Sequence, residues 1–149
     1  MTSKDVNYSF QDIRLMSSGY GVLVSLRTLA RTMAMPAKVG VYISVPLVLE
    51  IAQKLGVPAM PRNERQWFFE ETLKAAFDAE KLGEFLRLLK EAVAKEVESV
   101  KALMSTYPRT KELLQWSVDR AEEFVKKVDE VLAVYERFLK LKEEYGKPG

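Results

Sequence analysis

The chain has 149 residues, of which 48% are hydrophobic and 30% charged, and its 23 basic and 21 acidic residues leave a net charge of +2. This length and composition predict one soluble globular domain that is large enough to bury a core. Cysteine and histidine are both absent, which excludes disulfides, thiolate metal sites and catalysis by cysteine or imidazole. Together with the abundance of Glu and Lys, these absences favour a thermophilic, intracellular source.

Charge is distributed unevenly along the chain. Residues 1–65 carry eight basic and four acidic side chains, a net charge of +4, whereas the remainder has a net charge of −2. No apolar run reaches the roughly 20 residues that span a bilayer, and the N-terminus lacks the apolar core of a signal peptide. We therefore expect a cytoplasmic protein without membrane contact. Its single helical domain, residues 1–149, would consist of a mildly basic N-terminal half, residues 1–62, and a long helical hairpin, residues 63–149.

The first structural signal lies near the N-terminus. Ser9, followed three residues later by Asp12, resembles the capping box that satisfies backbone N–H groups at the start of a helix. It predicts a short helical turn over residues 10–16, which Ser-Ser-Gly at residues 17–19 interrupts. Beyond the interruption, apolar residues spaced three or four apart predict a helix over residues 21–34.

Residues 38–45 are the only segment with strand character. Valine or isoleucine alternates there with glycine, tyrosine or serine, a period of two over seven residues. One strand cannot form a sheet by itself. The segment is therefore either paired across a dimer or an extended connector whose apolar residues fill the core of a helical bundle.

Helix-terminating and helix-capping residues mark the middle of the chain. Ser44 is suited to an N-cap and Gly56 to a C-terminal cap, which predicts a short helix between them. Asn63 is predicted to cap the next helix. The apolar pattern over residues 64–105 fits either one long helix or two, because Gly83 inside a helix costs only about 1 kcal/mol.

The strongest pattern is the C-terminal stretch from Thr110 to Tyr145. Its apolar residues recur alternately four and three residues apart, as in the heptad seam of a coiled coil. The seam consists of Leu114, Val118, Ala121, Val125, Val128, Leu132, Tyr135 and Leu139. A second row, formed by Phe124, Val131, Phe138 and Tyr145, repeats every seven residues beside it. The turn predicted at Tyr107 and Pro108 makes this helix antiparallel to the preceding one.

These elements predict an all-α fold, a bundle of four to five helices. A long C-terminal antiparallel helical hairpin dominates it, with one short extended or β segment near residues 38–45. The apolar stripe of the final helix is wider than the preceding helix alone can cover, so we expect a homodimer or larger assembly. The expected interface residues are Trp67, Val125, Val128, Leu132, Tyr135 and Leu139.

Residues 38–77 resemble DNA-binding modules in two ways. The order of strand, helix, loop and helix resembles a ribbon-helix-helix module, which implies paired strands whose outward residues enter the major groove of DNA. Those outward residues would be Gly40, Tyr42 and Ser44. Residues 49–57 are also similar to the first helix and turn of a helix-turn-helix, with residues 62–66 opening the helix that reads bases. The simpler alternative is that the apolar residues of this region form core, followed by a glycine cap.

The candidate binding site is a group of basic residues in the first half of the chain. Arg62 and Arg65 lie about one helical turn apart at a predicted helix start, where backbone N–H groups and the helix dipole favour anions. Folding that gathers them with other cations would form a phosphate-binding patch, whereas dispersed they are ordinary surface charges. The candidate nucleic-acid-binding residues are Arg27, Arg31, Lys38, Lys54, Arg62 and Arg65.

No catalytic, metal or cofactor motif stands out. Neighbouring glutamates are typical of solvated helix faces, and the chain has no glycine-rich phosphate loop. Residues 67–69 are Trp-Phe-Phe, aromatic side chains that could stack on single-stranded nucleic acid. The simpler alternative is that they form core and interface. On a helix, at most two of the three can face the core. We expect a non-enzymatic helical assembly or interaction subunit. If it belongs to a nucleoprotein complex, its contacts with the nucleic acid would be independent of sequence. The alternative is a DNA-binding transcriptional regulator that uses residues 38–77.

Overall fold

The chain is all-helical over the part that the structure describes, in agreement with the predicted fold class. The computed structural model describes residues 19–145, so the turn predicted over residues 10–16 lies outside the described residues. Between residues 19 and 145 there is no strand. The helices are α2 (Tyr20–Met33), α3 (Pro36–Val39), α4 (Val45–Leu55), α5 (Arg65–Asp78), α6 (Leu82–Thr106), the 3-10 turn η2 (Pro108–Thr110) and α7 (Lys111–Tyr145).

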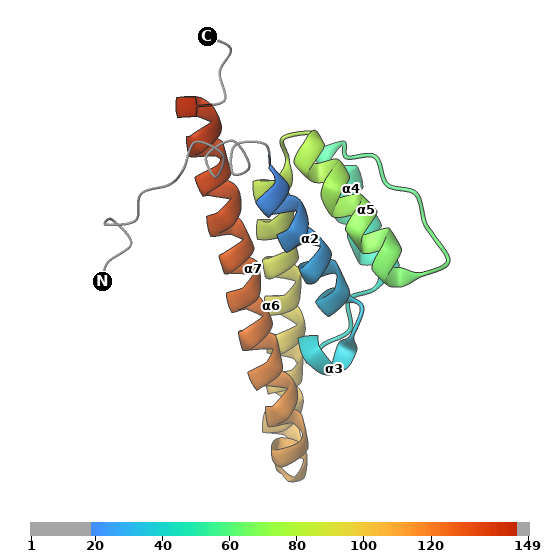
Figure 1. Cartoon of the computed structure of the whole chain (residues 1–149). Helices are drawn as coiled ribbons and strands as arrows, with labels where there is room; N and C mark the ends of the chain where they lie inside the picture. The colour runs from blue at the N-terminus through green and yellow to red at the C-terminus, as the bar shows by residue number, and fades with distance from the viewer. Residues whose placement is uncertain (1–18, 146–149) are drawn as a thin grey trace, which may run out of the picture.

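The two longest helices, α6 and α7, form an antiparallel hairpin, and the shorter helices lie beside it (Figure 1). The helices have 25 and 35 residues. Pro108 opens the turn between them, and the Thr110 hydroxyl donates to the carbonyl oxygen of Tyr107 at 2.7 Å. The hairpin and its turn were both predicted from the sequence, because a short turn between two amphipathic helices leaves them antiparallel.

The wide apolar stripe of α7 is covered by several neighbours within one chain. Besides α6, helices α2 and α3 contact α7. Most of the seam and all three described members of the second row are buried: Val118, Ala121, Phe124, Val128, Val131, Leu132, Tyr135 and Phe138. The expectation of more than one neighbour is thereby confirmed. Because α2 and α3 supply that cover, the width of the stripe does not require a second copy, and the homodimer stays a prediction.

Residues 38–45 do not form a strand, so the β alternative for this segment was wrong. Lys38 and Val39 belong to α3, and residues 40–44 are an irregular connector. The alternating pattern is nevertheless real, because Val39, Val41 and Ile43 are buried while Tyr42 is exposed. The apolar residues fill the core, which was the second of the two predicted alternatives.

The interval 64–105 contains two helices, the other alternative left open by the sequence. Helix α5 ends at Asp78, and Glu80 adopts a left-handed backbone conformation with φ 60°. The Lys81 N–H donates to the carbonyl oxygen of Ala76 at 2.8 Å, which satisfies a carbonyl at the helix end. Gly83 lies inside the first turn of α6 and does not break the helix.

Helix α4 begins and ends as predicted, whereas α5 begins differently. The Ser44 Oγ accepts a hydrogen bond from the Leu47 N–H at 3.1 Å, and Gly56 ends α4 with φ 70°. Glu64, not Asn63, is the N-cap of α5, and no side chain caps that end. The predicted cap at Asn63 was therefore wrong by one residue.

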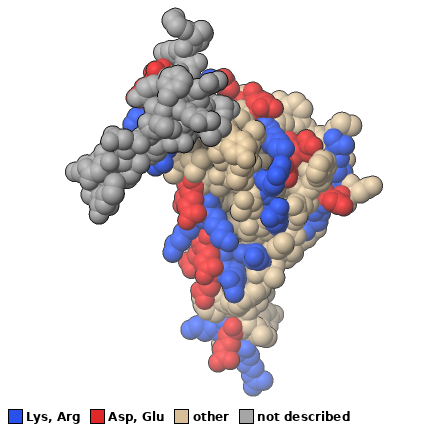
Figure 2. Space-filling model, in the orientation of Figure 1, with Lys and Arg blue, Asp and Glu red and all other residues tan. Residues whose placement is uncertain are grey.

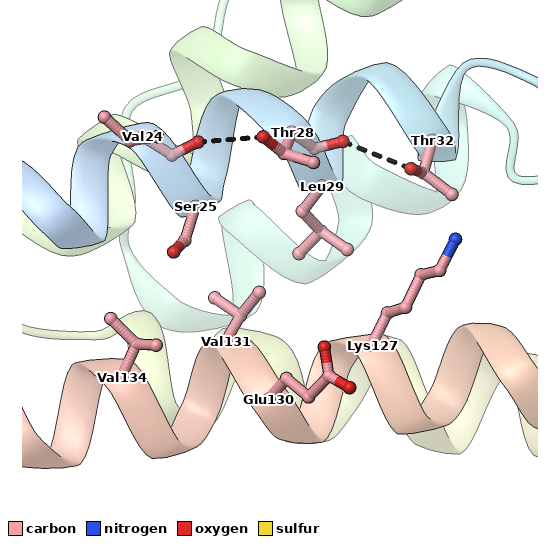
Figure 3. Close-up of a pocket in the computed structure, with 9 residues that line it drawn as sticks. All are labelled: Val24, Ser25, Thr28, Leu29, Thr32, Lys127, Glu130, Val131 and Val134. Carbon is pink, nitrogen blue, oxygen red and sulfur yellow. Dashed lines mark hydrogen bonds between the residues drawn. The ribbon is translucent and has the colours of Figure 1, made fainter.

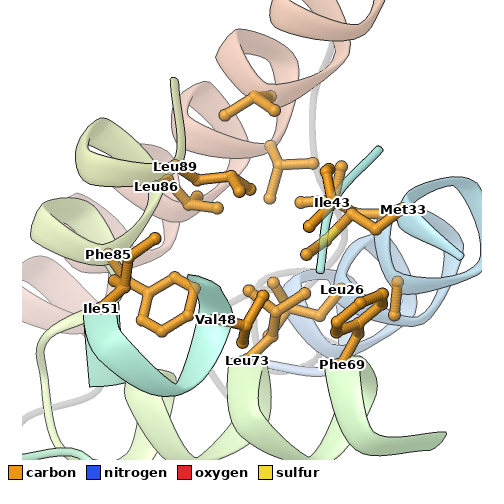
Figure 4. Packing of buried hydrophobic residues seen from close by; sticks show 14 of the residues in the cluster. Leu26, Met33, Ile43, Val48, Ile51, Phe69, Leu73, Phe85, Leu86 and Leu89 are labelled. Carbon is orange, nitrogen blue, oxygen red and sulfur yellow. The ribbon is translucent and has the colours of Figure 1, made fainter. Parts of the chain in front are cut away.

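One part of the core lies where α2, α4, α5 and α6 meet the connector before α4 (Figure 4), and the buried stripe of α7 belongs to the same cluster. Every one of these elements contributes a buried apolar side chain, as Figure 4 shows for Leu26, Met33, Ile43, Val48, Ile51, Phe69, Leu73, Phe85, Leu86 and Leu89. Phe68 and Phe69 are both buried and Trp67 is exposed, as the 100° rotation per helical residue requires. None of the helices found in residues 19–145 has the length and apolarity that crossing a membrane requires.

Candidate binding surfaces

Arg65, one of the predicted phosphate ligands, makes several contacts within the protein. Its guanidinium donates to the carbonyl oxygens of Ala34, at 3.4 Å, and of Ile43. The same group lies over two aromatic rings, with its central carbon 4.6 Å from the centroid of Tyr42 and 5.2 Å from that of Phe69. Arg65 therefore ties the start of α5 to the end of α2 and to the connector before α4.

The other predicted cations lie on α2, α3, α4 and the loop before α5. Arg27 pairs with Glu70 at 3.2 Å, and Lys54 pairs with Glu50 at 3.8 Å. Lys54 lies near the end of α4, about 14 Å along the helix from its first residue, Val45. The side chains of Arg31, Lys38 and Arg62 are exposed, at the end of α2, in α3 and in the loop before α5.

Arg65 lies beside the end of α2, the helix that carries Arg27 and Arg31, whereas Lys54 lies near the C-terminal end of α4. Figure 2 shows acidic and basic side chains interspersed along the hairpin on the face drawn. Nothing in this geometry tests the predicted nucleic-acid contact, so it stays a prediction. A variant that removes Arg65 is unsuitable for such a test, since it removes an internal contact together with a charge.

Replacing Arg65 with alanine is expected to destabilise the protein by about 2–4 kcal/mol, because two carbonyls lose a charged donor and two rings lose a stacked guanidinium. Arg65→Lys is expected to recover less than half of this loss, since an ammonium cannot reproduce the guanidinium fork. Urea denaturation measures both. Arg62→Ala, at an exposed position in the same region, is the control and should change the free energy of unfolding by less than about 0.5 kcal/mol. Equal losses at both positions would contradict the structural role.

Among the titratable groups of residues 19–145, two have shifted pKa values. Burial raises the pKa of Glu70, but ion pairing with Lys74 and Arg27 outweighs burial, so the pKa is lowered overall and the carboxylate stays ionised at neutral pH. Burial, assisted by Glu80 and Glu84, raises the pKa of Tyr135. Tyr135 packs edge-on against Phe77 in an aromatic cluster, and Glu70 joins α5 to α2. Both shifts have structural causes.

Most of the predicted interface residues are buried within the chain itself. Val128, Leu132 and Tyr135 belong to the core, and Val125 is half-buried against it. Trp67 and Leu139 are the exposed members, at 53% and 42%. In this conformation, only those two present a large accessible surface to a partner.

Four large apolar side chains near the tip of the hairpin are exposed, and none of them is among the predicted site residues. They are Leu103 (49% exposed), Tyr107 (59%), Leu113 (77%) and Trp116 (46%), and we call them the tip cluster. Beyond the α6–α7 pair and its turn, the nearest element is the end of α3, where Gly40 contacts Ser117 to Ala121. A signal was present in the sequence, because Leu113 and Trp116 fall outside the heptad seam that begins at Leu114.

A second surface is an apolar groove between α2 and α7, with a volume of about 330 Å³ (Figure 3). Its lining residues are Val24, Ser25, Thr28, Leu29, Thr32, Lys127, Glu130, Val131 and Val134. The hydroxyls of Thr28 and Thr32 each donate to the carbonyl four residues earlier, at 3.2 Å. These internal bonds occupy the hydroxyl protons, so the middle of the groove offers mainly methyl groups. A smaller hollow of about 120 Å³ shares Val134 and continues to Gly21 and Leu141.

No protein-family model matches the chain, and no curated protein or solved structure is similar enough to match it. Within residues 19–145, no three carboxylate, imidazole or thiol side chains gather as metal ligands would. The tip cluster and the α2–α7 groove are therefore the features from which a function can be argued.

Proposed function

We propose that the protein is a helical interaction subunit that binds a protein partner through the tip cluster. The observation that carries this proposal is the exposure of four large apolar side chains at one end of the hairpin. Contiguous exposed apolar surface is unusual on a soluble domain and is typical of interaction sites. Tyrosine and tryptophan are also among the residues that contribute most to protein–protein binding.

The shape of the hairpin supports this proposal. In Figure 1 the paired ends of α6 and α7 extend past α3, away from the other helices. Each long helix supports the other, so the tip cluster sits on a rigid element and binding would cost little ordering entropy. An exposed apolar centre on a preorganised support is a favourable arrangement for binding.

Charges around the tip cluster suggest the chemistry of the partner. Lys101, Arg109 and Lys111 are exposed beside it, with Glu112 as the acidic neighbour. A charged rim around an apolar centre mainly selects the partner and speeds association. We therefore expect a partner surface with an apolar pocket and a predominantly acidic rim.

Substituting Leu113 and Trp116 together with alanine is expected to weaken partner binding at least about tenfold, because central aromatic and aliphatic anchors often contribute about 2 kcal/mol or more. The partner is first identified by cross-linking the wild-type protein in an extract of its source cells, and affinity is then measured with the purified pair. Thermal unfolding should be nearly unchanged, since both side chains are exposed.

The control replaces two exposed apolar residues elsewhere, Tyr20 and Val24, with alanine. This variant should retain the partner as the wild type does. Equal affinity of the tip variant and the wild type for every reproducible partner would contradict the proposal. So would a failure of the wild type to retain any partner.

A further inference from the structure

We propose that the groove between α2 and α7 is the docking site of residues 10–16 of the same chain. The groove is lined by apolar side chains of both helices, among them Leu29 and Val131, yet Val24 and Val134 at its edge are exposed. No described element covers it. The inference concerns a different surface from the tip cluster, so either proposal can fail without the other.

The position of the groove fits a covalently attached occupant. The smaller hollow beside the groove is lined by Gly21 and Val22, and the described chain begins just before them, at Gly19. The α2 wall from Gly21 to Thr32 is about 17 Å long, at 1.5 Å per helical residue. Seven helical residues span about 10 Å. Because the described chain begins beside the smaller hollow, a segment of this length is long enough to extend from there to the middle of the groove.

The side chains of the segment also fit the groove. Phe10, Ile13 and Met16 are spaced three residues apart. On a helix, residues with this spacing share one face, which spans about 120° of the circumference. The polar residues Gln11 and Arg14 lie outside the centre of that face. An amphipathic helix in an apolar groove is a recurring binding mode, and the short connection gives this segment a high effective concentration over a second copy or a free ligand.

Disulfide trapping tests the proposal directly, because the chain has no cysteine of its own. The test pair is Ile13→Cys with Val134→Cys, a residue that lines both the groove and the smaller hollow. The control pair is Ile13→Cys with Glu91→Cys, which lies in the separate groove between α4 and α6. Under mild oxidation of dilute protein, the test pair should form an intramolecular disulfide at least about tenfold faster than the control pair, since a disulfide needs Cβ atoms within about 4.5 Å.

Equal rates for the two pairs would overturn the proposal, and so would a disulfide-linked dimer, which would assign the groove to a second copy. A companion measurement compares Ile13→Asp with Gln11→Asp in the full chain. Only Ile13→Asp should lower the Tm, by about 2–4 °C or more, because it places a charge against apolar walls. An unchanged Tm for Ile13→Asp would likewise overturn it.

Discussion

Replacing Gly40 with alanine is expected to destabilise the protein by at least about 3 kcal/mol, among the largest effects of any single methyl group in the chain. The connector passes so close to α7 that an added Cβ would lie 2.2 Å from the carbonyl oxygen of Ser117 and 2.8 Å from the backbone nitrogen of Ala121. Backbone atoms within a helix cannot rotate away as a flexible side chain would. Gly40 also has φ +82°, a conformation that costs alanine about 1–2 kcal/mol without any clash.

Two other glycines separate the clash from the backbone strain. Gly56 has φ +70° but nothing within 4 Å of an added Cβ, so Gly56→Ala should lose only about 1–2 kcal/mol. Gly21 lies in α2, and no described residue lies within 4 Å of an added Cβ, so Gly21→Ala should stabilise the protein by up to about 1 kcal/mol. Urea denaturation of the three variants gives the comparison. A loss at Gly40 no greater than that at Gly56 would show that the connector does not pack closely on α7.

The sequence predicted the elements whose signals are local. Helix α4 begins at a serine cap and ends at a left-handed glycine, and both residues were recognisable because capping depends on only a few neighbours. The hairpin was predictable for a similar reason, since a heptad pattern sustained from Leu114 to Leu139 overrides local uncertainty. These elements account for the all-helical fold class.

Features that depend on tertiary contacts were not predictable. Alternation of Val39, Val41 and Ile43 indicates alternating burial, and a connector between helices produces it as well as a strand does. Arg65 looked like a surface cation because the sequence does not show that Ala34 and Ile43 present their carbonyls to it. Periodicity in the sequence therefore predicts which side chains are buried. It predicts less securely whether a helix, a strand or a connector carries them.

The candidate surfaces differ from the predicted site for a related reason. Cations were selected by residue type, but their usefulness depends on where the chain carries them, and Lys54 lies at the far end of α4 from Arg65. The tip cluster depends on how far α6 and α7 extend beyond their neighbours. The part of α7 before its contact with Gly40, at Ser117 to Ala121, extends beyond α3, and only the folded chain reveals this.

Replacing Val128 with aspartate is expected to unfold the protein at room temperature. Val128 is completely buried in the seam of α7, and an unpaired carboxylate there costs several kcal/mol, a large part of the stability of a domain of this size. Circular dichroism measures the loss of helix. Leu139→Asp is the matched control on the same helix, and because Leu139 is 42% exposed, that variant should remain folded.

The same pair of variants also tests the predicted homodimer. If the seam is buried within one chain, Val128→Asp unfolds the monomer. The stability of the seam then does not depend on the oligomeric state that light scattering of the wild type reports. A folded Val128→Asp monomer obtained from a wild-type dimer would instead place the seam between two copies and contradict its burial within the chain. Exposed Leu139 and Trp67 remain available to a second copy in either case, so a wild-type dimer that Leu139→Asp dissociates would assign the interface to the outer edge of α7.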